Sequence, residues 1–235
     1  VPAISLAYEE KESNIMEKPP RDHTDRLVTA KLISFSYLQI GIIQALAGFY
    51  TYFVVLNDYG FPSSILPNLA DAFSMDLEDD PDKPVIIAGD DPYGSAKMYW
   101  PKNQKTYDLK ACNLKNANCH NPKEALAHAQ CAYFISIIVV QWADILACKT
   151  RTLSLLQQGM RNNHLNFGLV FETVLGAFMC YTPGLSDGLG TRAVEFVHWL
   201  PAMPFAMVIL SYDEIRKYIM REQGENGWVY INTYY

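Results

Sequence analysis

Apolar residues gather in four blocks along the chain, and polar stretches separate these blocks. The first block contains no charged residue over its whole length. At 1.5 Å per residue, about 20 residues are enough to cross a hydrocarbon core about 30 Å thick. The pattern therefore predicts four transmembrane helices, at residues 32–56, 125–148, 165–181 and 194–211.

The polar stretches predict which side of the membrane each connection faces. Lys and Arg recur in 1–31, in the short connection 149–164 and in 212–235, whereas the residues that follow the first block carry neither until Lys83. Because positively charged loops tend to stay in the cytosol, we expect these three segments to be cytosolic, with the C-terminus among them. The remaining connections, at 57–124 and 182–193, are then extracellular.

We therefore expect an all-α membrane protein with four transmembrane helices plus the end of a fifth, and with a long irregular extracellular loop at 57–124. The end of the fifth helix is expected at the apolar start of 1–31, ahead of a cytosolic connector. An apolar start without an initiator Met predicts a piece of a longer protein. A soluble bundle of buried helices is the alternative, but aromatic residues at the ends of the blocks favour a bilayer.

Composition changes this picture little, because the averages conceal the blocks. The mean hydropathy of −0.03 and the 19% of charged residues are typical of a soluble protein. Much of the net charge of −6 comes from the acidic run 76–82 in the outer loop, which we interpret as a solvated surface. The sequence has no glycine-rich loop ending in Lys-Ser/Thr and no His-Glu-x-x-His pair, so if the protein uses a nucleotide, we expect the residues that bind it to lie outside this chain. We expect a lipid bilayer, and not nucleic acid, as its surroundings.

Three polar residues lie inside the apolar blocks, and they are the candidate site. Gln141 and Asp144 are three residues apart and so share one face of a helix, and Glu172 belongs to the next block. An ionisable group in hydrocarbon is costly unless it is paired or hydrated, and by default it marks an ion pathway. Two carboxylates and an amide at a similar depth suit a small cation or a proton, because hard cations prefer oxygen ligands. Protonated carboxyls bonded to neighbouring helices are the alternative.

The five cysteines fall into two groups. Cys112 and Cys119 lie in the outer loop, where an oxidising compartment permits a disulfide between them. Cys131, Cys148 and Cys180 are at the ends of predicted helices, and we interpret them as inert thiols.

Several motifs, in order and at their expected spacing, carry a family resemblance. They include VPAISLAYE at the start, VVQWAD followed by CKTR, QQGM, YDE-x-RK and a terminal TYY. Together they resemble the alpha subunits of sodium/potassium-transporting ATPases, which are P-type cation ATPases. The resemblance covers nearly the whole chain except most of 62–124. It implies the tail of the sixth transmembrane helix, then helices seven to ten and the cytosolic C-terminus, in a multi-pass protein of the plasma membrane.

The resemblance also implies roles for individual residues. Gln141, Asp144 and Glu172 match positions that build the sodium-only third site of the family. Arg151 matches a residue that contacts the C-terminal tail, and that tail ends in Tyr234 and Tyr235.

Further positions match the partner contacts and a regulatory site of the family. Tyr93 and Gly94 belong to a partial match of the motif that binds the beta subunit, although Pro and Ser replace two of its residues. Gly48 would allow a close approach of the beta subunit's helix, or it serves packing within the chain. Ser154 matches a phosphorylation site, although Thr152 replaces one of the two basic residues of that motif.

The implied function is ATP-driven exchange of Na⁺ and K⁺ by the full-length pump. ATP and Mg²⁺ would be bound by upstream domains, and a beta subunit and a small single-span regulatory subunit would be the partners. A proton/potassium pump is the first alternative, favoured by Pro201–Phe205 and opposed by Glu172, where that pump typically carries a neutral amide. The second alternative is a membrane assembly module derived from the pump and without activity.

Overall fold

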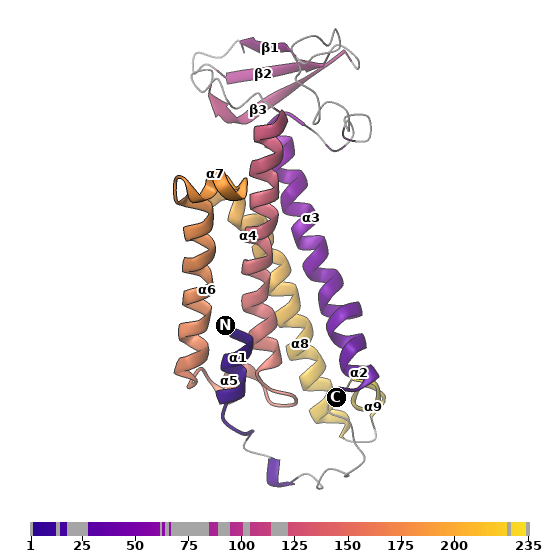
Figure 1. Ribbon diagram of the computed structural model, residues 1–235. Helices are drawn as coiled ribbons and strands as arrows, with labels where there is room; N and C mark the ends of the chain where they lie inside the picture. Colours follow the sequence, from indigo (N-terminus) through magenta and orange to yellow (C-terminus); the bar gives the residue numbers. More distant parts are fainter. Residues whose placement is uncertain are drawn as a thin grey trace. The chain divides into compact units, whose positions relative to one another are not determined.

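Helices dominate the computed structural model of the protein (Figure 1). The structure describes residues 2–12, 15–17, 28–61, 63, 66, 85–88, 95–100, 104–113, 122–224 and 227–233. The long helices are α3 (Gly41–Asp58), α4 (Pro122–Cys148), α6 (Asn163–Tyr181) and α8 (Met203–Gln223). Each overlaps one of the four apolar blocks, although α8 shares only residues 203–211 with the helix predicted at 194–211.

Two of these helices are extended by neighbouring helical segments. Upstream of α3, a short helix α2 (Ala30–Ile33) and a π-helical segment η3 (Ser34–Ile40) continue without a break. The Thr29 hydroxyl oxygen accepts a hydrogen bond from the Leu32 N–H and so caps this helix at its start. A 3₁₀ segment, η6 (Phe196–Ala202), leads into α8, which runs about three turns past the end of the apolar block.

By length and composition, two helices among the described residues are long and apolar enough to cross a membrane, at 30–58 and 124–148. Helix α6 starts with polar residues and contains Glu172, and the second half of α8 is charged, which lowers the hydropathy of both. The four-span count and the sidedness of the connections therefore stay predictions.

The remaining helical segments are short. They lie before the first long helix, between α4 and α6, after α6 and at the end of the described chain: α1 (Pro2–Ser5), η1 (Leu6–Tyr8), η2 (Ile15–Glu17), α5 (Leu155–Gln158), α7 (Leu185–Leu189) and α9 (Trp228–Thr233).

The predicted outer loop contains a sheet, so the prediction of an irregular loop was wrong for residues 85–88, 95–100 and 105–113. Strands β1 (Val85–Ala88), β2 (Ser95–Trp100) and β3 (Lys105–Asn113) pair antiparallel in the order β1-β2-β3. In β3, Tyr107, Leu109 and Ala111 alternate with polar residues, which is the period of a strand with one apolar face. This signal was present in the sequence, but the surrounding Pro, Asn and Asp residues concealed it.

The chain divides into two compact units, which are described separately. The first unit comprises 1–47, 135–178 and 202–235, and the second comprises 48–134 and 179–201. In the first unit, Ile135, Val139, Leu165 and Ile209 are completely buried. In the second unit, Val55, Leu56, Phe61 and three alanines of α4 are completely buried.

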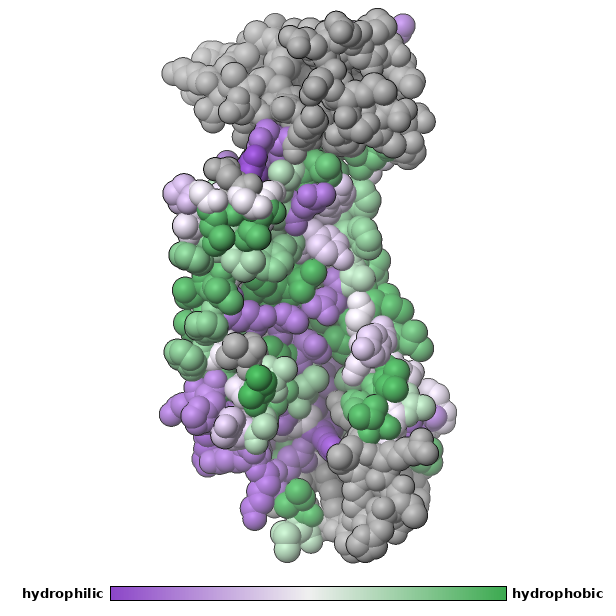
Figure 2. Space-filling model, viewed as in Figure 1, coloured by the Kyte–Doolittle hydropathy of each residue, from purple (hydrophilic) through white to green (hydrophobic). Residues whose placement is uncertain are grey.

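The first unit exposes large apolar side chains and buries charged ones. On α6, Phe167, Val170, Val174 and Phe178 are each more than half exposed at a helical spacing, and Figure 2 shows apolar residues over this helix. Asp213, Arg216 and Lys217 are instead buried. An exposed apolar stripe of this kind would be unfavourable in water and suits contact with lipid.

Candidate ion-binding site

Helix α4 presents Gln141 and Asp144 three residues apart. Both side chains are half-buried. The Asp144 carboxylate accepts a hydrogen bond from the Cys148 thiol one turn further along, with 3.8 Å between the sulfur and Oδ1. A thiol is a weak donor, so Asp144 keeps most of its capacity to accept hydrogen bonds or to bind a cation.

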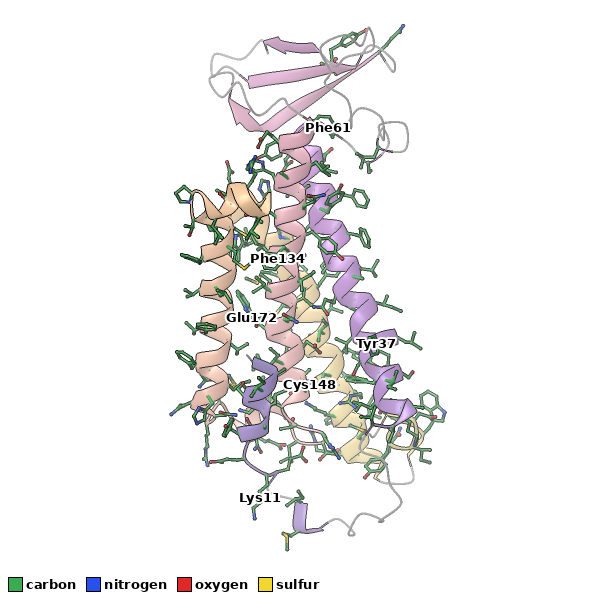
Figure 3. All side chains as sticks on the ribbon, in the orientation of Figure 1. Lys11, Tyr37, Phe61, Phe134, Cys148 and Glu172 are labelled. Atoms are coloured by element: carbon green, nitrogen blue, oxygen red, sulfur yellow. The ribbon has the colours of Figure 1, made fainter. Side chains whose placement is uncertain are left out.

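Helix α6 presents Glu172, labelled in Figure 3, and one oxygen of this carboxylate is unsatisfied. Its Oε2 atom is buried and has no hydrogen-bond partner among the described residues. An unpaired buried carboxylate oxygen costs several kcal/mol unless it gains a proton, a donor or a cation. Glu172 is therefore the group in this part of the chain that most needs a positive partner.

A hydrogen bond joins the two helices next to these residues. The Trp142 Nε1–H donates to the Thr173 hydroxyl oxygen across 3.1 Å, and that hydroxyl donates in turn to the Leu169 carbonyl oxygen. Trp142 directly follows Gln141, and Thr173 directly follows Glu172. The bond thus brings the two chain segments that carry the predicted ligands to the same level. No direct contact between Gln141, Asp144 and Glu172 is described.

A buried charge cluster on α8 was not assigned any role from the sequence. The Asp213 carboxylate pairs with Arg216 across 2.8 Å and with Lys217 across 2.5 Å, and all three side chains are at most 3% exposed. We call these three residues the α8 charge cluster. The spacing of three and four residues was a usable signal, because such residues meet on one helix face. The sequence analysis used these cations only to orient the helices in the membrane.

Lys217 links the α8 charge cluster to the helix that carries Asp144. Its Nζ donates to the Ala147 carbonyl oxygen across 3.0 Å and to the Thr150 hydroxyl across 2.9 Å. The last carbonyls of a helix have no partner within the helix, and a cation there also interacts favourably with the helix dipole. Asp213 lies close enough to Asp144 for the two carboxylates to interact electrostatically.

The described end of the tail is bound by two cations other than Arg151. Arg216 donates to the Thr233 carbonyl oxygen across 3.1 Å, and its guanidinium lies 4.5 Å from the centre of the Phe35 ring. Lys31 donates to the Ile231 carbonyl oxygen across 2.6 Å. Tyr234 and Tyr235 lie outside the described residues, so their docking on Arg151 stays a prediction.

The 149–164 connection is held by the start of the chain. The Glu12 carboxylate accepts hydrogen bonds from the Arg151 N–H and from the Thr152 hydroxyl, the latter across 2.9 Å. Lys149 lies 3.4 Å from the Glu9 carboxylate. The Arg151 side chain itself is exposed. Thr152, noted in the sequence as a replacement for a basic residue, thus has a structural role here.

Ser154, the predicted phosphorylation residue, is the N-cap of α5. Its hydroxyl oxygen accepts a hydrogen bond from the Leu156 N–H across 3.3 Å, and the Ser154 N–H donates to the Gln157 side-chain oxygen across 3.2 Å. A phosphate at a helix N-terminus is electrostatically favourable. Phosphorylation of Ser154 stays a prediction.

In the second unit, the predicted partner and disulfide residues are only partly described. A Cβ atom added to Gly48 would come within 2.6 Å of the Tyr133 ring, so this glycine permits a close contact within the chain. That contact is one of the two roles that the sequence left open, and a beta-subunit contact at Gly48 stays a prediction. Tyr93, Gly94 and Cys119 lie outside the described residues, as does the side chain of Cys112 in β3.

Comparison with known proteins gives a consistent result over the whole chain. Residues 1–219 match the family described as "Cation transporting ATPase, C-terminus". The chain is 44% identical to the sodium/potassium-transporting ATPase subunit alpha of Drosophila melanogaster, 45% to that of Hydra vulgaris, and 47% to subunit alpha-B of Artemia franciscana. These alignments cover 100% of this chain and 20–21% of each relative. The chain thus spans about a fifth of the length of these relatives, and it belongs to the family of cation-transporting ATPase C-termini.

Proposed function

We propose that this chain forms the C-terminal transmembrane part of the alpha subunit of an ATP-driven sodium/potassium exchange pump. In this proposal Gln141, Asp144 and Glu172 contribute the third sodium site, and the chain is a multi-pass part of a plasma-membrane protein with a cytosolic C-terminus. The observation that carries the proposal is the buried, unpartnered Oε2 atom of Glu172. Glu172 directly precedes Thr173, which accepts the Trp142 hydrogen bond that joins α4 to α6.

The chemistry of these residues suits a sodium ion as cargo. Carboxylate and amide oxygens are the ligands that hard cations prefer. Two negative charges in a medium of low dielectric constant attract a cation strongly, and the same charges repel each other when no cation is present. Occupation by sodium would relieve that repulsion and would satisfy Glu172 Oε2. Release of the ion then requires water or a proton to take its place.

The α8 charge cluster contacts both the helix that carries two of the proposed ligands and the tail. Lys217 binds the last turn of α4, the helix that carries Gln141 and Asp144. Arg216 binds the last described carbonyl of the tail. The tail and the candidate ligands are therefore connected through side chains of a single helix, and we propose that docking of the tail positions Asp144.

The remaining parts of the proposed activity belong to partners and to the longer pump. K⁺ would be the counter-transported ion, and the rest of the alpha subunit would bind ATP and Mg²⁺. A beta subunit would contact the outer loop at Tyr93 and Gly94, and a small single-span regulatory subunit would lie against the apolar helix faces. The proton/potassium alternative is not favoured, because the relatives named above are sodium/potassium ATPases.

The test compares Glu172→Gln with Glu222→Gln in the full-length pump. Glu222 is an exposed residue near the end of α8, so its replacement controls for loss of one carboxylate. Sodium-dependent phosphorylation of the pump is titrated for both variants. We expect Glu172→Gln to raise the sodium concentration needed for half-maximal phosphorylation several-fold and to leave potassium activation nearly unchanged. Identical sodium midpoints for both variants would refute the site.

A further inference from the structure

Two buried thiols from different helices face each other in the second unit. The sulfur atoms of Cys131 on α4 and Cys180 on α6 lie 3.0 Å apart. Cys131 is 2% exposed and Cys180 is completely buried. The sequence places these cysteines 49 positions apart and gave no indication that they meet. The sequence analysis interpreted both as inert thiols, and the contact itself does not test their reactivity.

The surroundings of the pair hold the two sulfurs in place. The backbone N–H of Arg192 donates to the Cys131 sulfur. The Arg192 guanidinium binds the Glu124 carboxylate through two bonds, of 2.7 and 3.0 Å, two turns before Cys131 on α4. Thr191 donates to the Met179 carbonyl oxygen, next to Cys180. Thr191 and Arg192, which follow α7, therefore bind both helices: Arg192 contacts α4 and Thr191 contacts α6.

We propose that Cys131 and Cys180 are a redox modification site, at which a peroxide joins α4 to α6 by a reversible disulfide. A disulfide needs its sulfurs about 2.05 Å apart, so the sulfurs must approach by about 1 Å, which small side-chain rotations supply. Cys131 is the slightly more exposed of the two thiols, so it is the one that reacts first.

The reaction balances with a peroxide as the oxidant. The Cys131 sulfur attacks one peroxide oxygen, the O–O bond breaks, and a sulfenic acid and one water are formed. The Cys180 sulfur then attacks the sulfenic sulfur, the S–O bond breaks, and a second water leaves as the S–S bond forms. The two thiols lose two electrons and two protons, and hydrogen peroxide is reduced to two waters. A soluble dithiol reverses the change by thiol–disulfide exchange.

The bond would fix the spacing of α4 and α6 within the second unit. Closing a long loop by a cross-link removes conformations from the unfolded chain, so the oxidised protein should resist unfolding better than the reduced one. The spacing of these helix ends would then depend on the oxidant that reaches them. This inference does not rest on the proposed ion selectivity.

The experiment treats membranes that contain the protein with hydrogen peroxide. Remaining thiols are blocked with N-ethylmaleimide under denaturing conditions, and the protein is digested with trypsin without reduction. We expect a linked pair of peptides, 124–149 and 162–192, whose mass is the sum of the two peptides plus one N-ethylmaleimide adduct on Cys148 and minus two hydrogen atoms. Alkylation of Cys131 and Cys180 should be lost together, and a dithiol should restore it.

Three variants assign the link. Cys148 lies in the same peptide as Cys131 and is exposed, so Cys148→Ser is the matched control and should leave the link intact. Cys131→Ala and Cys180→Ala should each abolish it. Differential alkylation of the unmodified protein needs no variant and covers the case in which a variant fails to fold. Full alkylation of both cysteines after peroxide treatment, or a link that requires Cys148, would overturn the proposal.

A second measurement tests the effect on the helices. The melting temperature of the oxidised protein is compared with that of the dithiol-treated protein, and the same comparison is made for Cys180→Ala. We expect a higher melting temperature on oxidation in the unmodified protein and no difference in the variant. A linked protein that melts at an unchanged temperature would contradict the stabilising effect of the bond.

Discussion

The two units bury different kinds of residue. In the first unit, Asp213, Arg216 and Lys217 are enclosed, and their charges are matched to one another and to carbonyl oxygens at the ends of other elements. In the second unit, the Arg192–Glu124 ion pair is less enclosed, with side chains 30% and 28% exposed, and Gly48 lies close to the Tyr133 ring. A fully buried cluster of matched charges distinguishes the first unit, whereas the second combines partly exposed ion pairs with close steric fit.

The difference shows where substitution should be tolerated. A buried ion pair contributes little net stability compared with apolar packing, but removing one partner leaves an uncompensated charge. A substitution at a close steric contact instead costs less stability, because neighbouring side chains can shift to accommodate the added volume. Charge changes in the first unit should therefore have larger effects than volume changes in the second.

The largest effect is expected for Asp213→Asn. This change leaves Arg216 and Lys217 buried without their shared carboxylate, which should cost about 3–5 kcal/mol. Thermal unfolding in detergent and the yield in the membrane measure the loss, with Glu222→Gln on the same helix as the control. A melting temperature equal to that of the control would show that the α8 charge cluster does not stabilise the first unit.

A smaller effect is expected for Gly48→Ala in the second unit. The added methyl group would meet the Tyr133 ring within 2.6 Å and should cost about 1–3 kcal/mol through displacement of the ring. Gly188→Ala is the matched control, since an added Cβ there meets nothing within 4 Å. In a Tyr133→Leu background the penalty should shrink. An equal penalty with and without the ring would show that Gly48 acts through something other than Tyr133.

Trp142→Phe tests the bond that joins α4 to α6. Loss of the hydrogen bond to Thr173 should cost about 1 kcal/mol of stability. It should also weaken apparent sodium affinity, because this bond holds the ligand-bearing segments of α4 and α6 at the same height along the two helices. Thr173→Val removes the same bond from the other side. The double variant should be little worse than either single variant. Fully additive losses would mean that the two side chains act independently.

The smallest effect on stability is expected at the tail. Lys31→Ala removes an exposed bond to the Ile231 carbonyl oxygen and should cost about 0.5 kcal/mol. Deletion of Tyr234 and Tyr235 should lower sodium affinity without removing a ligand. Sodium titrations of the deletion combined with Lys31→Ala or with Arg151→Ala then identify the residue that holds the tail. If a residue acts through the contact that the deletion removes, the combined loss of sodium affinity is smaller than the sum of the two single losses. Non-additivity with Arg151→Ala alone would favour the anchor expected from the resemblance.

The long helices were predictable, whereas contacts between distant segments were not. The first three apolar blocks locate their helices, because hydrocarbon requires every backbone group to be bonded within the segment, whereas α8 begins nine residues after the predicted helix 194–211 begins and ends twelve residues after it ends. Gln141, Asp144 and Glu172 were noticeable because polar residues are rare in such blocks. The α8 charge cluster was missed because its residues follow the apolar block, where cations are expected to face the cytosol. Its burial depends on Ala147, Thr150 and Phe35, which no local pattern connects to it.

The sheet and the thiol pair were missed for different reasons. The alternation in β3 is local and could have been recognised at Tyr107, Leu109 and Ala111. The meeting of Cys131 and Cys180 depends on how two helices lie against each other, and no spacing along the chain encodes that.

The π-helical segment Ser34–Ile40 has a consequence for changes in chain length. Wider turns accommodate an extra residue within a helix that otherwise keeps its α geometry. Two residues of this segment make contacts described here: Phe35 lies under Arg216, and Gln39 accepts a hydrogen bond from Tyr212. Deleting one residue between them would convert the segment to an ordinary α-helix and would change the facing of what precedes it only slightly, whereas the same deletion within α3 would turn everything before it by about 100°. The π-helical segment is therefore the place where this helix can lose a residue while Phe35 and the lysine at position 31 still face α8 and the tail.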